Sequence, residues 1–209
     1  MRAHIIGGRL IGVAALALGL SACTGLIPGS GPVPDLYTLS PKSSFDTALP
    51  EVSWQLVVEV PFASGGLATQ SIALRSNALE LRYFAGARWI ERAPRLVQTL
   101  LVESFENTGR IVAVGRAADL RSDFNLKSEL REFQAEYESE AAPPLIRVRL
   151  NAKIVQQPQR EIIASANFEA TARAAGTNMA AIITAFDEAF GKVLRRVVEW
   201  TLITADSRS

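Results

Sequence analysis

Cys23 is the one cysteine of the chain, and it directly follows Leu20, Ser21 and Ala22. A thiol can act as a nucleophile, bind a metal, form a disulfide or carry a covalent modification. A disulfide within the chain needs a second cysteine, so this thiol is free, paired between molecules or modified. The only histidine is His4. The side-chain chemistry open to the chain therefore centres on one cysteine near the N-terminus.

The residues before Cys23 have the three-part pattern of a secretory signal peptide. Arg2 and Arg9 are positively charged, residues 10–20 are apolar, and small residues follow. This apolar run of 11 residues is too short for a membrane-spanning helix, which needs about twenty residues. Residues 1–22 are therefore predicted to be a signal peptide. The alternative interpretation makes Cys23 merely a small apolar residue in a frayed N-terminus.

The segment Leu20-Ser21-Ala22-Cys23 resembles the lipobox of bacterial lipoproteins, which places the cleavage before Cys23. The resemblance implies a diacylglyceryl group on the Cys23 sulfur, with acyl chains such as palmitate, and usually a third, amide-linked chain. Two or more chains anchor a protein stably, whereas one chain binds a bilayer reversibly. Thr24 stands where inner-membrane lipoproteins of enteric bacteria typically have Asp. The resemblance thus implies an outer-membrane protein that is lipid-anchored on the periplasmic face.

The composition argues against several classes of function. Without Arg2 and Arg9 the net charge changes from +1 to −1, so no basic excess indicates a nucleic-acid partner. The mature chain also lacks histidine, and lipidation leaves it no free thiol. We therefore predict no catalytic residue, no cofactor and no metal site, and hence no enzyme. A periplasmic hydrolase that uses a carboxylate pair is the least favoured alternative.

The mature chain divides into an N-terminal stretch and one domain. Residues 23–50 are rich in Pro, Gly, Ser and Thr, which predicts a lipidated N-terminus and a flexible tether. Within this stretch, residues 36–39 form an apolar island that could add a short edge strand. Residues 51–205 are long enough for a single domain with its own core.

Alternating apolar and polar residues predict strands with one buried face over 54–60, 79–84, 111–114, 146–154 and 162–170. The last two are expected to pair as an antiparallel hairpin with one wet face. Leu79 and Ile162 are both placed on apolar faces by this alternation. In 124–133 the alternation slips by one residue after Leu130, which predicts a β-bulge.

Helical spacing predicts two helices. The first has Pro94 in its first turn and Gly109 as a left-handed stop. The second runs over 178–202, with Thr177 or Asn178 as its N-cap. Both helices must bury their apolar stripes against the strands. The predicted fold class is α+β, a single domain with a mostly antiparallel sheet and two helices packed on one face.

Two groups of residues are candidate sites. Tyr83, Phe84, Arg88 and Trp89 could form a partner interface, because aromatic residues and arginine anchor protein contacts; ordinary core packing is the alternative. A second group is acidic and lacks the Asp/Asn-Gly pattern of a calcium loop, so we interpret it as a solvated face. Its members are Glu129, Glu132, Glu136, Glu138 and Glu140.

Several segments, in the same order, resemble the ABC-type transport auxiliary lipoprotein family, which includes the lipoprotein of the paraquat-inducible system. After the lipobox they are Tyr37-Thr38-Leu39, Leu79-Glu80-Leu81-Arg82-Tyr83-Phe84, Arg88-Trp89-Ile90-Glu91 with Pro94, and residues 124–133. The similarity extends over nearly the whole mature chain. Phe124 departs from the family, which often has Tyr there, and the change is conservative.

The resemblance implies a non-enzymatic accessory subunit of a transporter that comprises an ATPase, a permease and a mammalian-cell-entry substrate-binding protein. Such systems move phospholipids or other hydrophobic molecules across the periplasm. The resemblance does not decide whether the chain forms a homo-oligomer. The alternative is a structural or outer-membrane-assembly lipoprotein that binds peptidoglycan or an envelope protein.

Overall fold

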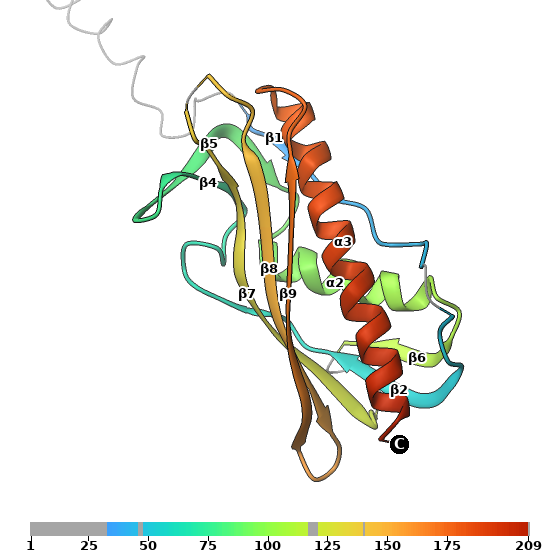
Figure 1. Cartoon of the computed structure of the whole chain (residues 1–209). Helices are drawn as coiled ribbons and strands as arrows, with labels where there is room; N and C mark the ends of the chain where they lie inside the picture. The colour runs from blue at the N-terminus through green and yellow to red at the C-terminus, as the bar shows by residue number, and fades with distance from the viewer. Residues whose placement is uncertain (1–32, 46–47, 117–120, 140, 209) are drawn as a thin grey trace, which may run out of the picture. The chain divides into compact units, whose positions relative to one another are not determined.

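The computed structural model describes residues 33–45, 48–116, 121–139 and 141–208 (Figure 1). Two helices and a many-stranded sheet form one α+β domain, which confirms the predicted fold class. The elements are β1 (Asp35–Tyr37), β2 (Val52–Val58), β3 (Phe62–Ala63), β4 (Ser71–Asn77), β5 (Glu80–Trp89), α2 (Ala93–Glu106), β6 (Ile111–Gly115), β7 (Phe124–Glu136), β8 (Leu145–Gln156), β9 (Glu161–Arg173) and α3 (Met179–Asp206).

The strands form one 9-stranded sheet in which β7 is the central strand. β7 pairs with β8, and β8 pairs with β9, in long antiparallel ladders that make the sheet mostly antiparallel. Shorter parallel pairings join β7 to β2, β3 and β4. The hairpin of β4 and β5 extends the sheet on one side, where β1 adds beside β5. This arrangement leaves one face of the β7–β9 ladder to the helices and the other to solvent.

The slip predicted after Leu130 is confirmed as a register shift between Leu130 and Glu132 of β7. The hairpin predicted for 146–170 is also confirmed. Ile162, however, does not lie on the buried face, because a second register shift beside Val155 displaces the start of β9 and leaves Ile162 55% exposed.

Leu79 also does not lie on a buried face, because its side chain is 99% exposed. It lies in the β4–β5 turn rather than in a strand, and its backbone N–H donates to the Asn77 side chain.

Both helices are present as the spacing predicts. Pro94 occupies the first turn of α2, and Gly109 follows this helix with a left-handed φ of 60°. Asn178 is the N-cap of α3, because its side-chain oxygen accepts a hydrogen bond of 2.9 Å from the backbone N–H of Ala181. The buried stripes of both helices join the inner face of the sheet in one hydrophobic core.

The folded domain begins earlier than the sequence indicates. The compact unit starts at Pro34, so the described residues of the predicted 23–50 tether from Pro34 onward belong to the domain. The apolar island does form an edge strand, β1, and Leu39 after it is buried. Ser40 then donates its backbone N–H to Asp187 of α3 at 2.6 Å. The Pro- and Ser-rich composition does not predict this attachment. Only a small number of apolar side chains and hydrogen bonds hold the extended segment on the domain.

Candidate partner-binding surface

The predicted lipidation site, Cys23, lies outside the described residues, as do Leu20, Ser21 and Ala22. Their roles therefore stay predictions from the sequence. None of the helices in the described ranges has the length and apolar character that crossing a membrane requires.

Tyr83 lies on β5 with 43% of its surface exposed. Its hydroxyl donates a hydrogen bond of 3.0 Å to the carbonyl oxygen of Gly66, which fixes the turn between β3 and β4 against the strand. Gly66 is suited to this contact, since a Cβ there would come within 2.7 Å of the Leu81 side chain. Tyr83 is thus an exposed aromatic residue held in place at its polar end.

Trp89 is a correction to the predicted interface. Its side chain is only 1% exposed and lies in the core, so it cannot contact a partner directly. The indole packs on Phe133 of β7 at 5.3 Å between ring centroids and on Phe186 of α3 at 5.2 Å. Core packing, the alternative weighed for this aromatic cluster, is therefore what the structure shows for Trp89.

Phe84 and Arg88 differ from Trp89 in their surroundings. Phe84 is half-buried, and its ring is tilted against Tyr137 with centroids 6.4 Å apart. Arg88 is exposed and lies opposite Leu36 of β1 and Ser71 of β4. Tyr83 and Arg88 are therefore the predicted interface residues that the structure leaves accessible.

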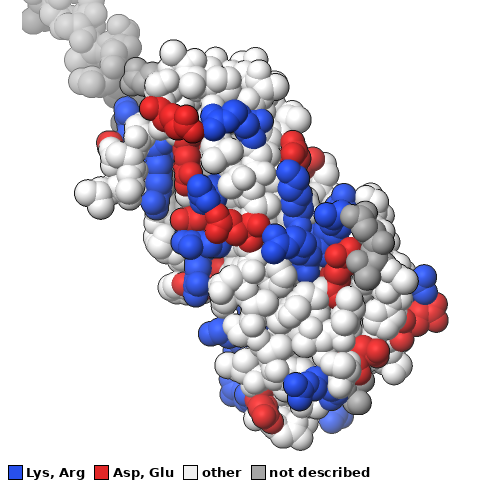
Figure 2. All heavy atoms as spheres, in the orientation of Figure 1, with Lys and Arg blue, Asp and Glu red and all other residues white. Residues whose placement is uncertain are grey.

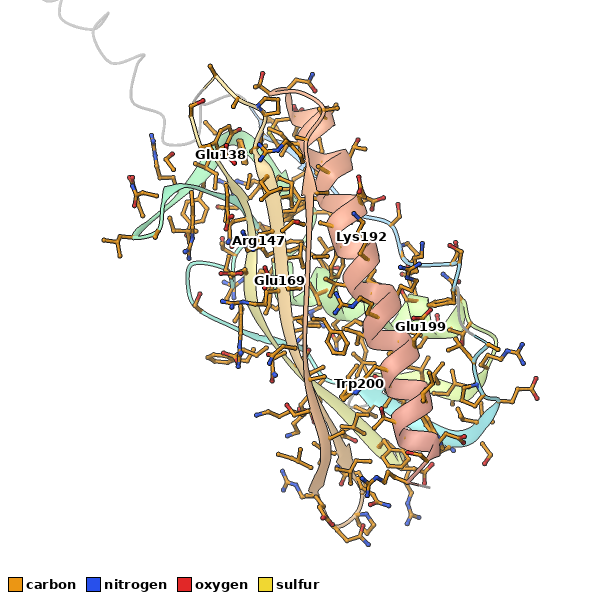
Figure 3. The ribbon with its side chains drawn as sticks, in the orientation of Figure 1. Glu138, Arg147, Glu169, Lys192, Glu199 and Trp200 are labelled. Atoms are coloured by element: carbon orange, nitrogen blue, oxygen red, sulfur yellow. The ribbon has the colours of Figure 1, made fainter. Side chains whose placement is uncertain are left out.

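A mixed-charge surface, which we call the outer face, covers the side of the β7–β9 ladder that points away from the helices (Figure 2). Arg147 on β8 is its central residue, between acidic residues of both neighbouring strands (Figure 3). Its guanidinium donates to both carboxylate oxygens of Glu136 on β7 at 3.0 Å, and it also donates to Glu169 on β9. One arginine thus ties three strands together.

The electrostatics of Arg147 favour its charged form. Burial lowers the pKa of the guanidinium, but the hydrogen bonds and charges of Glu136 and Glu169 outweigh burial and raise the pKa above the ordinary arginine value. Beside this group, burial raises the pKa of the Tyr137 hydroxyl. Both groups therefore keep their protons near neutral pH.

The acidic run lies on this outer face or beside it, as interpreted from the sequence. Each of its described members forms an ion pair with an arginine rather than clustering with other acids. The pairs are Glu129–Arg131, Glu132–Arg149, Glu136–Arg147 and Glu138–Arg173. Glu140 is outside the described residues. Within the described ranges, no group of three metal-ligating side chains lies close together.

A depression of about 460 Å³ lies between the β4–β5 turn and the upper end of the outer face. Arg75 and Asn77 line it from β4, and Glu136, Tyr137 and Arg147 line it from β7, the residue after β7, and β8. The alternation of Arg147 and Arg149 with buried residues predicted a wet face. The partners of each residue across the sheet, and the place of the depression, depend on the register and the order of the strands. The local sequence pattern determines neither.

The fold is a small α+β domain with a mixed-charge sheet face. The chain belongs to the family of the ABC-type transport auxiliary lipoprotein component, whose family model matches residues 37–198. The expected family is therefore confirmed, and its name implies association with an ABC transport system. Membership also implies a membrane-anchored place in the cell envelope.

One solved structure supports this assignment, and a second shares the fold. The chain is similar to the protein XCC0632 of Xanthomonas campestris, a DUF330 protein, with 32% identity and a TM-score of 0.78 over 84% of this chain and 99% of that one. The protein CT253 of Chlamydia trachomatis has a TM-score of 0.52 at 9% identity, over 75% of this chain and 99% of that one, and so shares the fold alone.

A relative is also known at the sequence level. The uncharacterised protein bll6063 of Bradyrhizobium diazoefficiens is 29% identical over 198 residues, which is 94% of this chain. The chain spans about half (51%) of the length of that relative.

Proposed function

We propose that this protein is a non-enzymatic, outer-membrane lipoprotein subunit of a mammalian-cell-entry type ABC transport system. It would assist the movement of phospholipids or other hydrophobic molecules across the periplasm. The observation that carries the proposal is the family match, which extends over almost all of the folded domain, from residue 37 to residue 198. The signal peptide and lipobox pattern before Cys23 support a periplasmic anchor.

In this proposal, Cys23 carries the lipid and Thr24 directs the protein to the outer membrane. Because the compact unit begins at Pro34, residues 24–33 join the lipid to the domain. This connection is much shorter than the predicted tether, so the domain would work close to the leaflet. The substrate-binding protein of the transporter would then have to reach the lipoprotein near the outer membrane.

The contact with that substrate-binding protein is proposed to include Tyr83 and Arg88 on β5. Tyr83 supplies an exposed ring whose hydroxyl is already bound to Gly66, so little freedom is lost when a partner covers it. Arg88 supplies an exposed cation nearby on the same strand. Tyrosine and arginine, together with tryptophan, are enriched among the energetically dominant contacts of protein interfaces.

The test is co-purification of the full-length lipidated protein with the ATPase, permease and substrate-binding protein, followed by identification of the co-eluting lipids. Tyr83→Ala and Arg88→Glu are expected to lower recovery of the substrate-binding protein. Arg160→Glu, which reverses the charge of an exposed residue in the β8–β9 turn, is the control and should leave recovery unchanged. If no transporter component co-purifies with the wild type, the proposed function is wrong. If only the Arg160 variant loses the partner, the proposed surface is wrong.

A further inference from the structure

β9 is an edge strand that α3 covers only in part. Among the described strands it pairs with β8 alone. Toward its C-terminal end, two basic side chains of α3 reach its backbone. Arg196 donates to the carbonyl oxygen of Glu169 at 2.8 Å, and Lys192 donates to the carbonyl oxygen of Thr171 at 3.4 Å. Lys192 and Glu169 are labelled in Figure 3 at this part of the strand. Half of the strand edge is thus occupied by the helix.

The same contacts show which backbone groups face outward along β9. Residues alternate between the two sides of a strand, so the outward carbonyl groups of Glu169 and Thr171 imply outward groups at Ser165 and Asn167. Ala166 lies between these two residues, so its carbonyl oxygen should point toward β8 instead. It does, because it accepts a hydrogen bond of 3.1 Å from the side chain of Asn151 on β8. In the described part of the chain, no hydrogen bond from another element reaches the backbone of Ser165 or Asn167.

The surroundings of this open edge differ on its two sides. On the helix side, Trp200 is half-buried against Phe168, with ring centroids 5.4 Å apart. Ile203, which is 46% exposed, follows Trp200 by about one turn along α3. Figure 3 shows Trp200 on the lower half of α3, facing β9. On the outer face, Lys153 of β8 is exposed directly opposite Ser165. An added strand would therefore meet apolar groups on one side and a cation on the other.

Lys153 has unusual neighbours across the sheet. Its partner on β7 is Lys127, a like charge, and its partner on β9 is the uncharged Ser165. Lys127 is paired with Glu59 at 3.5 Å, whereas Lys153 has no acidic partner among the described residues. Like charges directly opposite each other destabilise a sheet. In the neighbouring part of the ladder, by contrast, Arg149 lies opposite Glu132 and Glu169. At Lys153, unlike at Arg149, the neighbouring position on β9 thus holds an uncharged residue, Ser165, in place of an acidic one.

We propose that the edge of β9 from Ala164 to Asn167 binds an extended segment of a partner protein as an added strand. The segment would alternate apolar residues, which face Trp200 and Ile203, with polar residues that include an acid facing Lys153. Neighbouring strands lie about 4.8 Å apart, so Lys153 needs to reach about 10 Å across β9. The small side chain of Ser165 lies under this path, and a lysine and a glutamate together can span it.

This inference does not depend on the transport role. It is tested by selecting a phage-displayed library of random 12-residue peptides on the purified full-length lipoprotein in detergent. Bound peptides are then compared on variants by fluorescence polarisation. Asn167→Pro removes the outward N–H, and edge strands tolerate proline at such a position. It also removes the side-chain hydrogen bonds that Asn167 accepts from Arg131 and Asn151, so Asn167→Ala, which loses these bonds but keeps the N–H, is compared with it and should bind like the wild type. Thr171→Pro is the matched control, because it removes an outward N–H in the half that α3 already covers.

The selected peptides are expected to alternate apolar and polar residues and to contain an acid. Asn167→Pro should weaken their binding about tenfold, the effect of losing one or two hydrogen bonds. Lys153→Gln should weaken it about threefold, and this loss should disappear at high salt. Thr171→Pro should bind like the wild type, and circular dichroism verifies that each variant is folded.

Three results would overturn the proposal. One is a selection that yields no peptide sensitive to Asn167→Pro. Another is an equal loss with Thr171→Pro, which would mean that distortion of β9 and not a missing donor weakens binding. The third comes from sedimentation: if the wild type self-associates through this edge and Asn167→Pro makes it monomeric without any peptide binding, the occupant is a second copy of the chain.

Discussion

Trp89 of β5 and Phe186 of α3 pack edge to face, with ring centroids 5.2 Å apart and an interplanar angle of 85°. Phe133 of β7 completes the cluster, at 5.3 Å from each of the other two rings. The three rings come from segments far apart in the sequence, so they join the β4–β5 hairpin, the central strand and the C-terminal helix. A surface that uses Tyr83 or Arg88 is therefore held from beneath by this cluster.

Phe186→Ala is expected to lower the free energy of unfolding by about 3–5 kcal/mol, because it deletes a fully buried ring and leaves a cavity between α3 and the sheet. Urea unfolding followed by circular dichroism measures the change. Ile90→Ala is the control, since Ile90 follows Trp89 directly but is 55% exposed, and its effect should stay within about 0.5 kcal/mol. Equal effects of the two substitutions would show that the cluster does not hold the elements together.

Asn178→Ala should cost about 1 kcal/mol of stability, because the side-chain oxygen of Asn178 accepts from the backbone N–H of Ala181 at the start of α3. Thr177→Ala is its matched neighbour and should be nearly neutral, because the N-cap position belongs to Asn178. Thermal unfolding of the two variants separates these expectations. A larger loss for Thr177→Ala would mean that the helix begins one residue earlier in solution.

The sequence contains enough to predict the elements that repeat over many residues. α3 and the β8–β9 hairpin follow long apolar periods, and the bulge after Leu130 is visible as one slip in the alternation. The attachment of Leu39 and Ser40 is not visible, because it depends on a few contacts with α3 and the core. Local patterns therefore define secondary structure here better than they define the domain boundary.

The sequence does not show which residues of the candidate interface are exposed. Tyr83, Phe84 and Trp89 are all aromatic residues of one short segment, and residue type alone does not separate an exposed ring from a buried one. Gly86, with a φ of 70°, also distorts β5 between them, where the pairing with β4 shifts in register, so simple alternation does not extend from Tyr83 to Trp89. The register with β1 and β4, which only the fold provides, decides that Arg88 faces solvent and Trp89 the core.

Arg147→Met is expected to lower stability by about 1 kcal/mol, because it leaves Glu136 and Glu169 without their shared partner. The raised pKa of Arg147 means that its contribution is fully present below the ordinary arginine pKa and is lost only as the pH rises through the folded-state value. From pH 6 to pH 9 the difference between wild type and variant should therefore not change through Arg147 itself. Urea unfolding at several pH values measures it.

Arg173→Met is the control for Arg147→Met. Arg173 forms an ion pair with Glu138 at 2.9 Å, but the two side chains are 49% and 74% exposed to solvent. Water and salt screen such a pair, so this substitution should have little effect on unfolding. A loss as large as that of Arg147→Met would argue against a special role for the arginine that joins three strands.

Cys23→Ser is expected to abolish incorporation of radiolabelled palmitate and to release the protein from the membrane fraction, because serine cannot form the thioether. Thr24→Asp should keep the label but move the protein toward the inner membrane in a host with the enteric sorting rule. Thr24→Ser is the control for this second change. Density-gradient fractionation of membranes measures both outcomes, and retention of Cys23→Ser on membranes would show a different anchor.

The double substitution Lys192→Ala and Arg196→Ala should increase self-association, because it uncovers the carbonyl groups of Thr171 and Glu169 at the edge of β9. Exposed strand edges pair readily with other strands, and basic side chains across an edge oppose such pairing. Arg196 also lies over the ring of Phe168 at 5.8 Å, so its removal exposes apolar surface at the same place. Sedimentation velocity over a range of concentrations measures the effect. Arg95→Ala with Arg121→Ala removes the same net charge from exposed positions elsewhere and should leave the oligomeric state unchanged. If this control associates as strongly, loss of charge repulsion and not an open edge is the cause.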